Sequence, residues 1–437
     1  MVENYRPISL TCICCKIMES IIKAQTTEFL EKNGLLSKCQ FGFRSGKSTS
    51  LQLLQCTDYW TKKLDNKTPV DIIYLDFAKA FDTVSHIKLD EKVQRCGIKG
   101  DLLLWLRAFL SNRTQRVCVN NTFSSSCNVS SGVPQGSVLG PLMFLIFIND
   151  LPDIVCDDVN CVLFADDVKI YRSICSSKDN ESLQSTLDKI SLWCSRWKLK
   201  LSTSKCITLH LGKNNPNFIY TLNREKLETE KSCRDLGVLV SEDCKFSKHI
   251  NNIVKSAYQK VWQIMKVFES KDAKLLVKAF TTFIRPVLEY CSIIWSPFLL
   301  KDINLIEKVQ KRFTKRICKN KQASYAQRLK FFDLQSLEER RIKIDLIETF
   351  KFMHHTQSRN FEDFFCKSRN SFGQSNKLYV NFSRTDMRKN WFGNRVCFLW
   401  NKLPPQIRKA GTLLEFKRLL DSFEVKASFC RGLITKA

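Results

Sequence analysis

Three aspartates in two separate segments have the residue type and the setting that phosphoryl transfer requires. Asp76 ends an apolar, β-rich run at 70–75, and Asp166 and Asp167 lie at the tip of a predicted hairpin. Adjacent strands lie about 4.8 Å apart, so carboxylates at neighbouring strand ends can share metal ions. Mg²⁺ accepts one or two carboxylates together with substrate phosphates, and two such ions stabilise the attacking and leaving oxygens of an in-line displacement. The alternative for Asp166 and Asp167 alone is ordinary turn chemistry, because Asp tolerates turn geometry.

Hydrophobic periodicity divides the chain into a mixed first half and a helical second half, which is typical of an α+β protein. The predicted elements are helices within 1–65, a strand at 70–75, a helix around 102–110, strands at 116–119 and 123–129 on either side of Asn120-Asn121, an apolar helix at 142–148, hairpin arms at 161–165 and 168–171, a helix at 183–197, strands at 206–211 and 236–240, and helices after residue 245.

The charge balance favours a polyanionic partner. The 437-residue chain carries 70 Lys and Arg against 43 Asp and Glu, which gives a net charge of +27. Each Lys or Arg that neutralises a phosphate releases a bound counterion, so this excess favours nucleic acid. The alternative is a solvated surface charge that serves solubility.

The first residues, the cysteines and the longest apolar run do not suggest a secreted or membrane protein. The first residues are polar, without the apolar core of a signal peptide, and the 20 cysteines are scattered through apolar stretches, as buried thiols of a reduced protein would be. The most apolar run, at 142–148, is far shorter than the ~20 residues of a membrane helix. We therefore expect an intracellular protein without a membrane partner and identify no targeting signal.

Three blocks of the sequence resemble the catalytic motifs of reverse transcriptases of non-LTR retrotransposons, in the family's order and at similar spacing. They are YLDFAKAFD at 74–82, SGVPQGS at 131–137 and FADD at 164–167. The flanking blocks that also match are NYRPISL at 4–10, FGFR at 41–44, SKC at 204–206, DLGV at 235–238, SLEERR at 336–341 and WN at 400–401. The nearest branch is that of jockey and chicken-repeat elements, and the resemblance covers nearly the whole chain.

The resemblance implies a right-hand polymerase that adds dNTPs to a primer 3′-OH on an RNA template. It implies fingers at 1–65, a palm with an antiparallel sheet at 66–244, a helical thumb at 245–325 and a C-terminal extension of unknown role at 326–437. It assigns two Mg²⁺ ions, with Mn²⁺ as the alternative metal, to Asp76, Asp166 and Asp167, of which Asp167 matters least for direct ligation.

The family's motifs also imply a nucleotide site. Phe81 stands five residues after Asp76, where the family has an aromatic steric gate that excludes a 2′-OH; the alternative is a core residue. Gln135 and Gly136 would contact the incoming nucleotide, because Gly lets backbone approach closely and Gln is both donor and acceptor. The alternative there is a Gly-Pro loop without a ligand.

Cations in three places receive roles from the same resemblance. Arg44 and Lys47 would meet the triphosphate through charge-assisted pairing, and the alternative is a pair of solvated loop cations. Lys205 resembles the proposed general acid to the leaving pyrophosphate, and the alternative is a surface lysine. Asp82 is not a metal ligand by its place in the motif, and we expect it to cap the following helix.

A cationic face in the predicted thumb is a candidate for contact with the template–primer backbone. An apolar stripe of Ile306, Val309, Phe313 and Ile317 predicts a helix, and its other face carries Lys308, Lys311, Arg312, Lys315 and Arg316. Such contacts position nucleic acid without reading its sequence. The alternative is a solvated helix face.

The expected partners are an RNA template, a DNA primer or RNA–DNA hybrid, and dNTPs. The family's endonuclease is not recognised in the sequence, so we expect it to act in trans, and the family implies the nucleus and a cytoplasmic ribonucleoprotein as locations. Two other functions stay open at this point. One is an inactive or truncated polymerase remnant that only binds RNA, and the other is an RNA-templated RNA polymerase, against which Phe81 argues.

Overall fold

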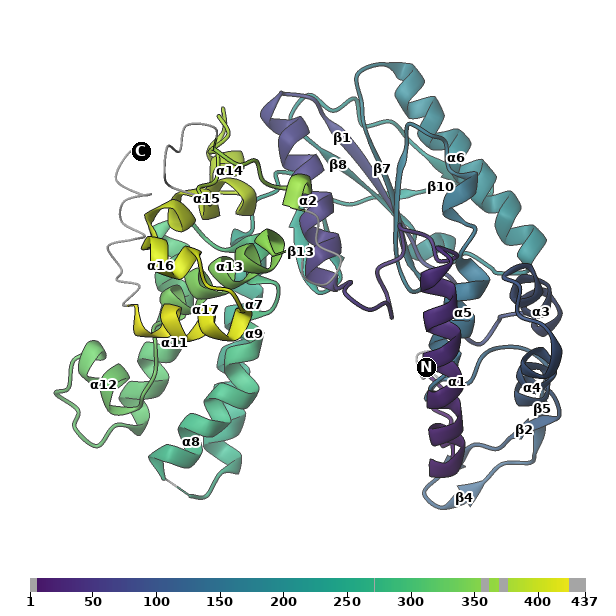
Figure 1. Cartoon of the computed structure of the whole chain (residues 1–437), viewed down its shortest axis with the longest axis horizontal. Helices are drawn as coiled ribbons and strands as arrows, with labels where there is room; N and C mark the ends of the chain where they lie inside the picture. The colour runs from purple at the N-terminus through teal and green to yellow at the C-terminus, as the bar shows by residue number, and fades with distance from the viewer. Residues whose placement is uncertain (1–5, 271, 355–360, 369–375, 424–437) are drawn as a thin grey trace. The chain divides into compact units, whose positions relative to one another are not determined.

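The chain forms two compact units in the computed structural model, which describes residues 6–270, 272–354, 361–368 and 376–423. Unit 1 comprises residues 1–48, 69–210 and 214–230, and unit 2 comprises residues 49–68, 211–213 and 231–437. Unit 1 combines a five-stranded sheet with helices, whereas unit 2 is mostly helical (Figure 1). The predicted α+β class is therefore confirmed.

The sheet of unit 1 has the strand order β11-β8-β1-β7-β6. Its strands are β1 (Val70–Leu75), β6 (Asn160–Phe164), β7 (Asp167–Ser173), β8 (Ile207–Leu211) and β11 (Glu228–Thr229). β7 pairs antiparallel with both β1 and β6, while β11 pairs parallel with β8. The predicted antiparallel arrangement thus holds for the three strands around the aspartates, but the sheet as a whole is mixed.

The hairpin formed by β6 and β7 turns one residue earlier than the sequence predicts. Phe164 pairs with Asp167, so the two central residues of the turn are Ala165 and Asp166, and Asp167 already belongs to β7. Ala165 has a φ of +56°, and a positive φ at the first central residue is compatible with a tight hairpin turn. Asp166 therefore lies in the turn, and Asp167 lies at the start of the strand.

A buried helix, α5 (Gly140–Ile148), anchors the core of unit 1. All of its residues from Leu142 to Ile148 are buried, and all but Leu145 share one hydrophobic cluster with the inner residues of β1 and β7. This confirms the predicted apolar helix. The remaining helices of unit 1 are α1 (Ile13–Lys32), α3 (His86–Arg95), α4 (Gly100–Leu110) and α6 (Ser177–Trp197), with 3-10 turns at Pro152–Ile154 and Thr203–Lys205.

Short hairpins complete unit 1. They are built from β2 (Arg113–Gln115) with β5 (Cys127–Val129), β3 (Cys118–Val119) with β4 (Thr122–Phe123), and β9 (Thr221–Leu222) with β10 (Glu225–Lys226). Asn120 and Asn121 both have positive φ between β3 and β4, which is the turn chemistry that a two-residue hairpin favours. The predicted strand at 123–129 is interrupted, because its two ends pair with different partners.

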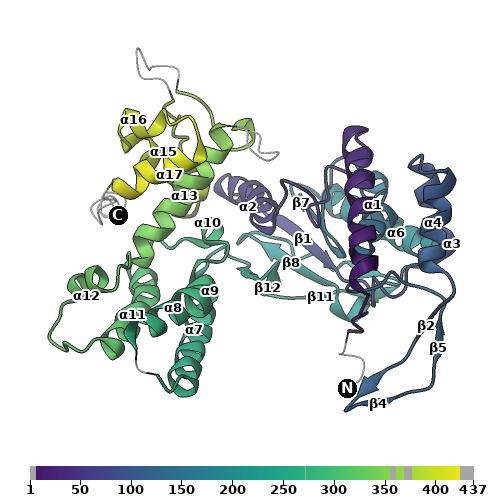
Figure 2. The ribbon, with the colours of Figure 1, turned by 60° about the horizontal axis from the view of Figure 1, so that its bottom comes forward.

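Unit 2 is built mainly of helices, with one small hairpin of β12 (Ser232–Asp235) and β13 (Val238–Ser241). Its helices are α2 (Thr49–Asp65), α7 (Ser247–Val267), α8 (Ala273–Ala279), α9 (Arg285–Glu289), α10 (Ser292–Trp295), α11 (Leu300–Ile317), α12 (Tyr325–Phe331), α13 (Leu337–Met353), α14 (Asp386–Lys389), α15 (Phe392–Lys402), α16 (Pro405–Arg408) and α17 (Leu413–Ser422), with a π-helical turn at Phe280–Ile284 and a 3-10 turn at Phe361–Asp363. Helix α7 packs beside both α9 and α11 (Figure 2).

The predicted amphipathic helix of unit 2 is confirmed as α11. Ile306, Val309, Phe313 and Ile317 are buried, as the apolar stripe predicts. Among the described residues, no helix combines the length and the apolar character needed to cross a membrane. The cysteines of the same part of the chain are thiols rather than disulfides, as expected for a reduced protein.

Candidate active site and nucleic-acid interface

The pairing of β1 with β7 brings the three predicted acids to one end of the sheet. Leu75 is the Cα partner of Val168, so Asp76, the next residue, continues this register toward Asp167. Asp166 precedes Asp167 in the turn. Acids that are far apart in the sequence thus come to neighbouring strand ends, and their role as metal ligands stays a prediction.

The electrostatics of the site reflect two carboxylates held partly out of water. Burial raises the pKa of Asp76, and the charges of Lys205 and Arg6 oppose this only in part. Burial likewise raises the pKa of Asp166, where Arg6 lowers it and the charge of Asp76 raises it further. Repulsion between two nearby carboxylates is a recognised cause of such a shift. Asp167, in contrast, is exposed.

The segment 200–206 holds Asp76 from the side and so positions Lys205. The backbone N–H of Ser202 donates to the carbonyl oxygen of Asp76 at 2.8 Å, and the N–H of Asp76 lies 3.5 Å from the sulfur of Cys206. Lys205 is exposed, and its charge acts on Asp76. The structure therefore places the predicted general acid beside the acids.

The donor set fits divalent metals in chemistry, although it is not a closed cage. No cluster of three His, Cys, Asp or Glu side chains arranged to hold a metal is found in the described part of the chain. Mg²⁺ does not need one, because it is commonly bound by one or two carboxylates plus substrate phosphates. Asp76 and Asp166 are partly buried, and their negative charges repel each other. A cation bound between them would offset this repulsion.

Phe81 and the loop that carries Gln135 are joined by backbone pairing. The N–H of Val133 donates to the carbonyl oxygen of Phe81 at 2.8 Å. The side-chain amide of Gln135 donates to the carboxylate of Asp82, also at 2.8 Å. Asp82 therefore orients Gln135 rather than capping the following helix, whose N-cap, Ser85, has no side-chain capping bond. The expected capping role of Asp82 was wrong.

The ring of Phe81 lies on the core rather than within it. It is half-buried and stacks on the fully buried Phe144, with ring centroids 4.4 Å apart and planes inclined by 19°. Phe144 therefore supports the ring, and part of the residue stays exposed. A gate and a packing residue share these features.

Gly136 is required by the close approach of residues 8–9. Its φ is +103°, and a Cβ there would lie 2.8 Å from the carbonyl oxygen of Ser9. The N–H of Ser9 also donates to the carbonyl oxygen of Gln135 at 2.7 Å.

The buried carboxylate of Glu19 accepts from the N–H groups of Val138 and Leu139 at 2.7 and 3.0 Å. The loop is thus held from two sides.

Arg44 and Lys47 are engaged with protein groups. The guanidinium of Arg44 donates to both carboxylate oxygens of Glu31 and to the carbonyl oxygens of Leu36 and Ser37. The ammonium of Lys47 lies 4.3 Å from the ring centroid of Phe41. This geometry gives Arg44 a structural use that the sequence did not suggest, and its predicted contact with triphosphate stays a prediction.

Arg6 is the functional candidate that the sequence reading missed. It is exposed, and its charge acts on both Asp76 and Asp166. Its sequence signal is the match of block 4–10 to a known family, which by itself assigns no role to Arg6. Its position beside the acids depends on the tertiary fold.

A comparison with known families decides the assignment. Residues 2–240, more than half of the chain, match the family described as reverse transcriptase (RNA-dependent DNA polymerase). The chain belongs to the reverse transcriptase family. All three motifs that carry the acids, Phe81 and Gln135 fall within the matched residues, and membership places the fold in the right-hand polymerase class.

The relatives of this reverse transcriptase come from transposons. The probable RNA-directed DNA polymerase from transposon X-element of Drosophila melanogaster is 30% identical over 72% of this chain and 35% of its own length. The RNA-directed DNA polymerase from mobile element jockey of the same organism is 28% identical over 72% of this chain and 36% of its own length. The chain thus spans about a third of these relatives, and the predicted resemblance to the jockey branch of non-LTR elements is confirmed.

A solved telomerase from Candida tropicalis in complex with a fragment of telomeric RNA is 10% identical. It covers 92% of this chain and 55% of its own, with a TM-score of 0.44. At this score the likeness adds nothing to the family assignment.

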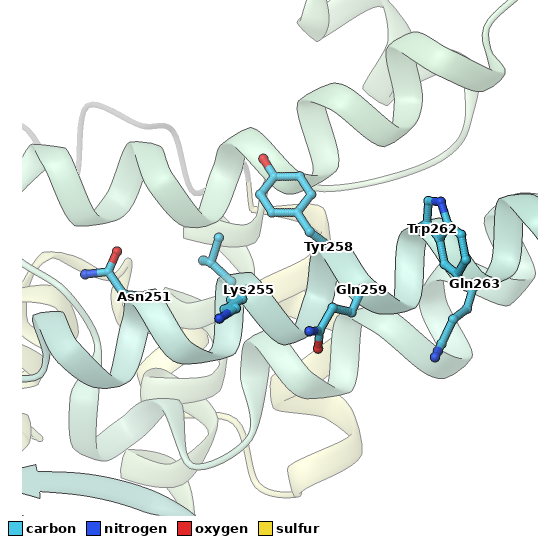
Figure 3. A pocket seen from close by; sticks show the side chains of 7 residues that line it. Asn251, Lys255, Tyr258, Gln259, Trp262 and Gln263 are labelled. Carbon is cyan, nitrogen blue, oxygen red and sulfur yellow. The ribbon is translucent and has the colours of Figure 1, made fainter.

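The second candidate surface of the reverse transcriptase lies in unit 2, on α11 and the neighbouring α7. Lys308, Arg312, Lys315 and Arg316 are exposed, and Lys311 is half-buried. The guanidinium carbon of Arg312 lies 5.5 Å from the ring centroid of Tyr258 on α7. A hollow along α7 is lined by Asn251, Val254, Lys255, Tyr258, Gln259, Trp262 and Gln263 (Figure 3). Aromatic rings beside cations and amides are a combination that suits a nucleic-acid backbone and its bases.

Proposed function

We propose that this reverse transcriptase adds deoxynucleotides to a primer 3′-OH on an RNA template and releases pyrophosphate. Asp76, Asp166 and Asp167 would hold two Mg²⁺ ions, with Mn²⁺ as the alternative metal. The observation that carries the proposal is the meeting of these acids at neighbouring strand ends, where burial and, as a smaller cause, the charge of Asp76 raise the pKa of Asp166. When bound, the two metals supply charge stabilisation to the attacking and leaving oxygens.

The protein side chains supply positioning and countercharge. Arg6 and Lys205 provide positive charge beside the acids, where the triphosphate of the incoming nucleotide would lie. Lys205 would give a proton to the leaving pyrophosphate. Gln135, oriented by Asp82, and Gly136 would contact the nucleotide, and Phe81 would lie under its sugar. Pre-organised electrostatics of this kind commonly supply most of the rate in phosphoryl transfer.

The cationic face of α11, together with the hollow along α7, would bind the backbone of the RNA–DNA hybrid. Their support is the exposure of four cations on one helix face beside Tyr258. The fingers at 1–65, palm at 66–244, thumb at 245–325 and C-terminal extension at 326–437 remain the proposed division, and an endonuclease acting in trans remains a proposed partner. The nucleus and a cytoplasmic ribonucleoprotein remain the proposed locations.

A primer-extension assay tests the central proposal. The purified chain is given poly-rA template, oligo-dT primer, Mg²⁺ and dTTP, and is compared with Asp166→Asn and with the control Asp157→Asn, an exposed aspartate of the same unit. We expect Asp166→Asn to abolish extension, a loss of about a hundredfold to a thousandfold or more, as for a group that acts on developing charge, with RNA affinity and fold retained. Asp157→Asn should extend as wild type does.

Three results would contradict the proposal. Extension by Asp166→Asn at the wild-type rate would mean that the metal site is misassigned. Failure of the wild-type chain to extend, with RNA binding retained, would favour the remnant that only binds RNA, and faster use of rNTPs than of dNTPs would favour an RNA polymerase.

A further inference from the structure

A single buried glutamine grips the backbone immediately before Asp166. The side-chain oxygen of Gln40 accepts from the N–H groups of Gly42 at 2.8 Å and Ala165 at 2.9 Å. Its side-chain nitrogen lies 3.5 Å from the carbonyl oxygen of Ala165, to which it donates. Gln40 is only 3% exposed. One side chain therefore holds both polar backbone groups of the first central residue of the turn.

The segment around Gln40 is fixed against the same hairpin by its own backbone. The N–H of Phe41 donates to the carbonyl oxygen of Leu163 at 2.8 Å, and the N–H of Leu163 donates to that of Cys39 at 2.9 Å. Gln40 and Leu163 form a parallel bridge. The grip on Ala165 therefore comes from a segment that is registered with β6, not from a side chain that reaches across solvent.

The turn needs such external support. Ala165 has a φ of +56°, a left-handed conformation that is unfavourable for a residue with a Cβ. Strained residues of this kind persist where the surroundings over-determine them. The next residue, Asp166, is half-buried beside Asp76, so a relaxation of the turn would let the two carboxylates move apart.

We propose that Gln40 is a positioning residue for catalysis, which fixes Ala165 so that Asp166 stays placed to share a cation with Asp76. This inference rests on the metal site proposed above. Partners of metal ligands typically affect metal affinity or activity by about 10–100-fold when removed. Gln40 acts in this way through the backbone of the turn rather than through contact with the ligand itself.

The competing explanation is that Gln40 only satisfies a buried loop, and the chain offers a matched control. The side-chain oxygen of Gln184 accepts from the N–H of Thr221, and its side-chain nitrogen donates to the carbonyl oxygen of Thr221, both at 2.9 Å. This is the same two-sided grip in the same unit, on a residue outside the proposed site. Replacing Gln184 therefore measures how much stability is lost when such a pair of side-chain amide hydrogen bonds is removed outside the proposed site.

The experiment compares Gln40→Met with Gln184→Met. Both substitutions remove the amide group and keep a side chain of similar size. Extension is measured as a function of Mg²⁺ concentration, alongside template–primer affinity and Tm. We expect Gln40→Met to lower kcat and to raise the Mg²⁺ concentration for half-maximal extension, each by about tenfold, with template–primer affinity unchanged. Gln184→Met should also lower Tm, by less than Gln40→Met because Gln184 is only half-buried, while its Mg²⁺ dependence stays that of wild type.

Equal Mg²⁺ dependence in wild type and Gln40→Met, or an equal shift in both variants, would overturn the inference. If Gln40→Met does not fold, Gln40→Asn replaces it, because its amide is too short to reach both Gly42 and Ala165. The same rise in the Mg²⁺ requirement is expected, and an unchanged Mg²⁺ dependence would again overturn the inference. Asp166→Asn is measured in parallel. If it still extends, the metal site itself is wrong, whereas if it is inactive and Gln40→Met has wild-type metal dependence, only the role of Gln40 fails.

Discussion

Phe81 packs against the core and keeps part of its surface exposed, so a packing residue is also available as the proposed gate. Its ring rests on Phe144, which is fully buried, and yet it keeps an exposed side. Support from below limits how far the ring can retreat, so a group that approaches its open side meets a firm surface. A sugar carrying a 2′-OH would meet more of that surface than a deoxyribose would.

We expect Phe81→Ala to relax the preference for dNTPs over rNTPs by about tenfold or more, which corresponds to about 1.4 kcal/mol of lost discrimination. The measurement is the ratio of kcat/KM for dTTP and UTP on the same primer. Phe81→Tyr, which keeps the ring, should retain the wild-type ratio. An unchanged dTTP/UTP ratio of kcat/KM in Phe81→Ala would mean that Phe81 serves only in packing.

The acids predict how pH and metal act together on stability. Burial raises the pKa of Asp76 and of Asp166, so each binds a proton more tightly in the folded protein than in the unfolded chain. The contribution of the pair to stability therefore increases as pH falls through the raised pKa values, and above them the desolvated charges cost stability. A cation that binds the folded state offsets that cost.

We accordingly expect Mg²⁺ to raise Tm at mildly alkaline pH and to raise it less as the pH is lowered, because protons compete with the metal for these carboxylates. Thermal unfolding at several Mg²⁺ concentrations and pH values measures this. Asp166→Asn should have a higher metal-free Tm at alkaline pH and a smaller Mg²⁺ effect. A Mg²⁺ effect that is independent of pH, or equal in the variant, would place the ion elsewhere.

The segment 39–42 and the β6–β7 hairpin form one structural element around the turn. Gly42 approaches that turn so closely that a Cβ would lie 2.4 Å from the backbone nitrogen of Ala165. No real Cβ contact is that short, so either the segment or the turn must move when a side chain is added. Motions of even about 1 Å at a reacting centre can cost about a hundredfold in rate.

Gly42→Ala is therefore expected to reduce primer extension by about a hundredfold while leaving the helices of the protein intact, as judged by circular dichroism. Gly411→Ala is the control, because its Cβ would meet only an ordinary contact at 3.7 Å. Wild-type extension by Gly42→Ala would show that the turn tolerates displacement, which would also weaken the case for Gln40.

Unit 2 joins segments from distant parts of the sequence through buried charges. The carboxylate of Asp65 on α2 accepts from the N–H groups of Arg384 and Thr385 at 2.8 to 3.1 Å. Arg388 forms an ion pair with Asp58 at 2.7 Å, although burial still raises the pKa of Asp58. These bonds make α2 and the residues after 383 parts of one compact unit, across more than 300 positions of sequence.

The net charge of +27 is a property of the whole molecule. We expect only some of its cations, those on the exposed face of α11, to contact nucleic acid. Each phosphate contact contributes about 0.7 to 0.9 to the slope of log K against log salt. We expect Arg312→Ala and Lys315→Ala each to weaken binding of an RNA–DNA hybrid and to reduce that slope by about this amount. Fluorescence anisotropy over a range of salt concentrations gives both quantities. Lys178→Ala, an exposed lysine of unit 1, should leave the slope unchanged, and an equal change in all three variants would contradict a dedicated surface.

The sequence by itself determined the family, the three aspartates and most of the elements, because these depend on short motifs and on local periodicity. The stripe from Ile306 to Ile317 predicts a helix face that is indeed buried. Periodicity does not say what lies against a face: α1 is a helix as predicted, yet Ile17 and Ile21 are both 57% exposed. The placement of the hairpin turn was off by one residue, since an alanine with positive φ carries no sequence signal.

Only the tertiary structure decided how the side chains around the site pair. Asp82 orients Gln135 across 53 positions, and Gln40 holds Ala165 across 125. Arg44, whose motif suggested a phosphate ligand, is engaged with Glu31 and nearby carbonyl groups. A hydrogen bond between residues far apart in the chain depends on where the backbone brings them, and neither residue type nor spacing encodes that meeting.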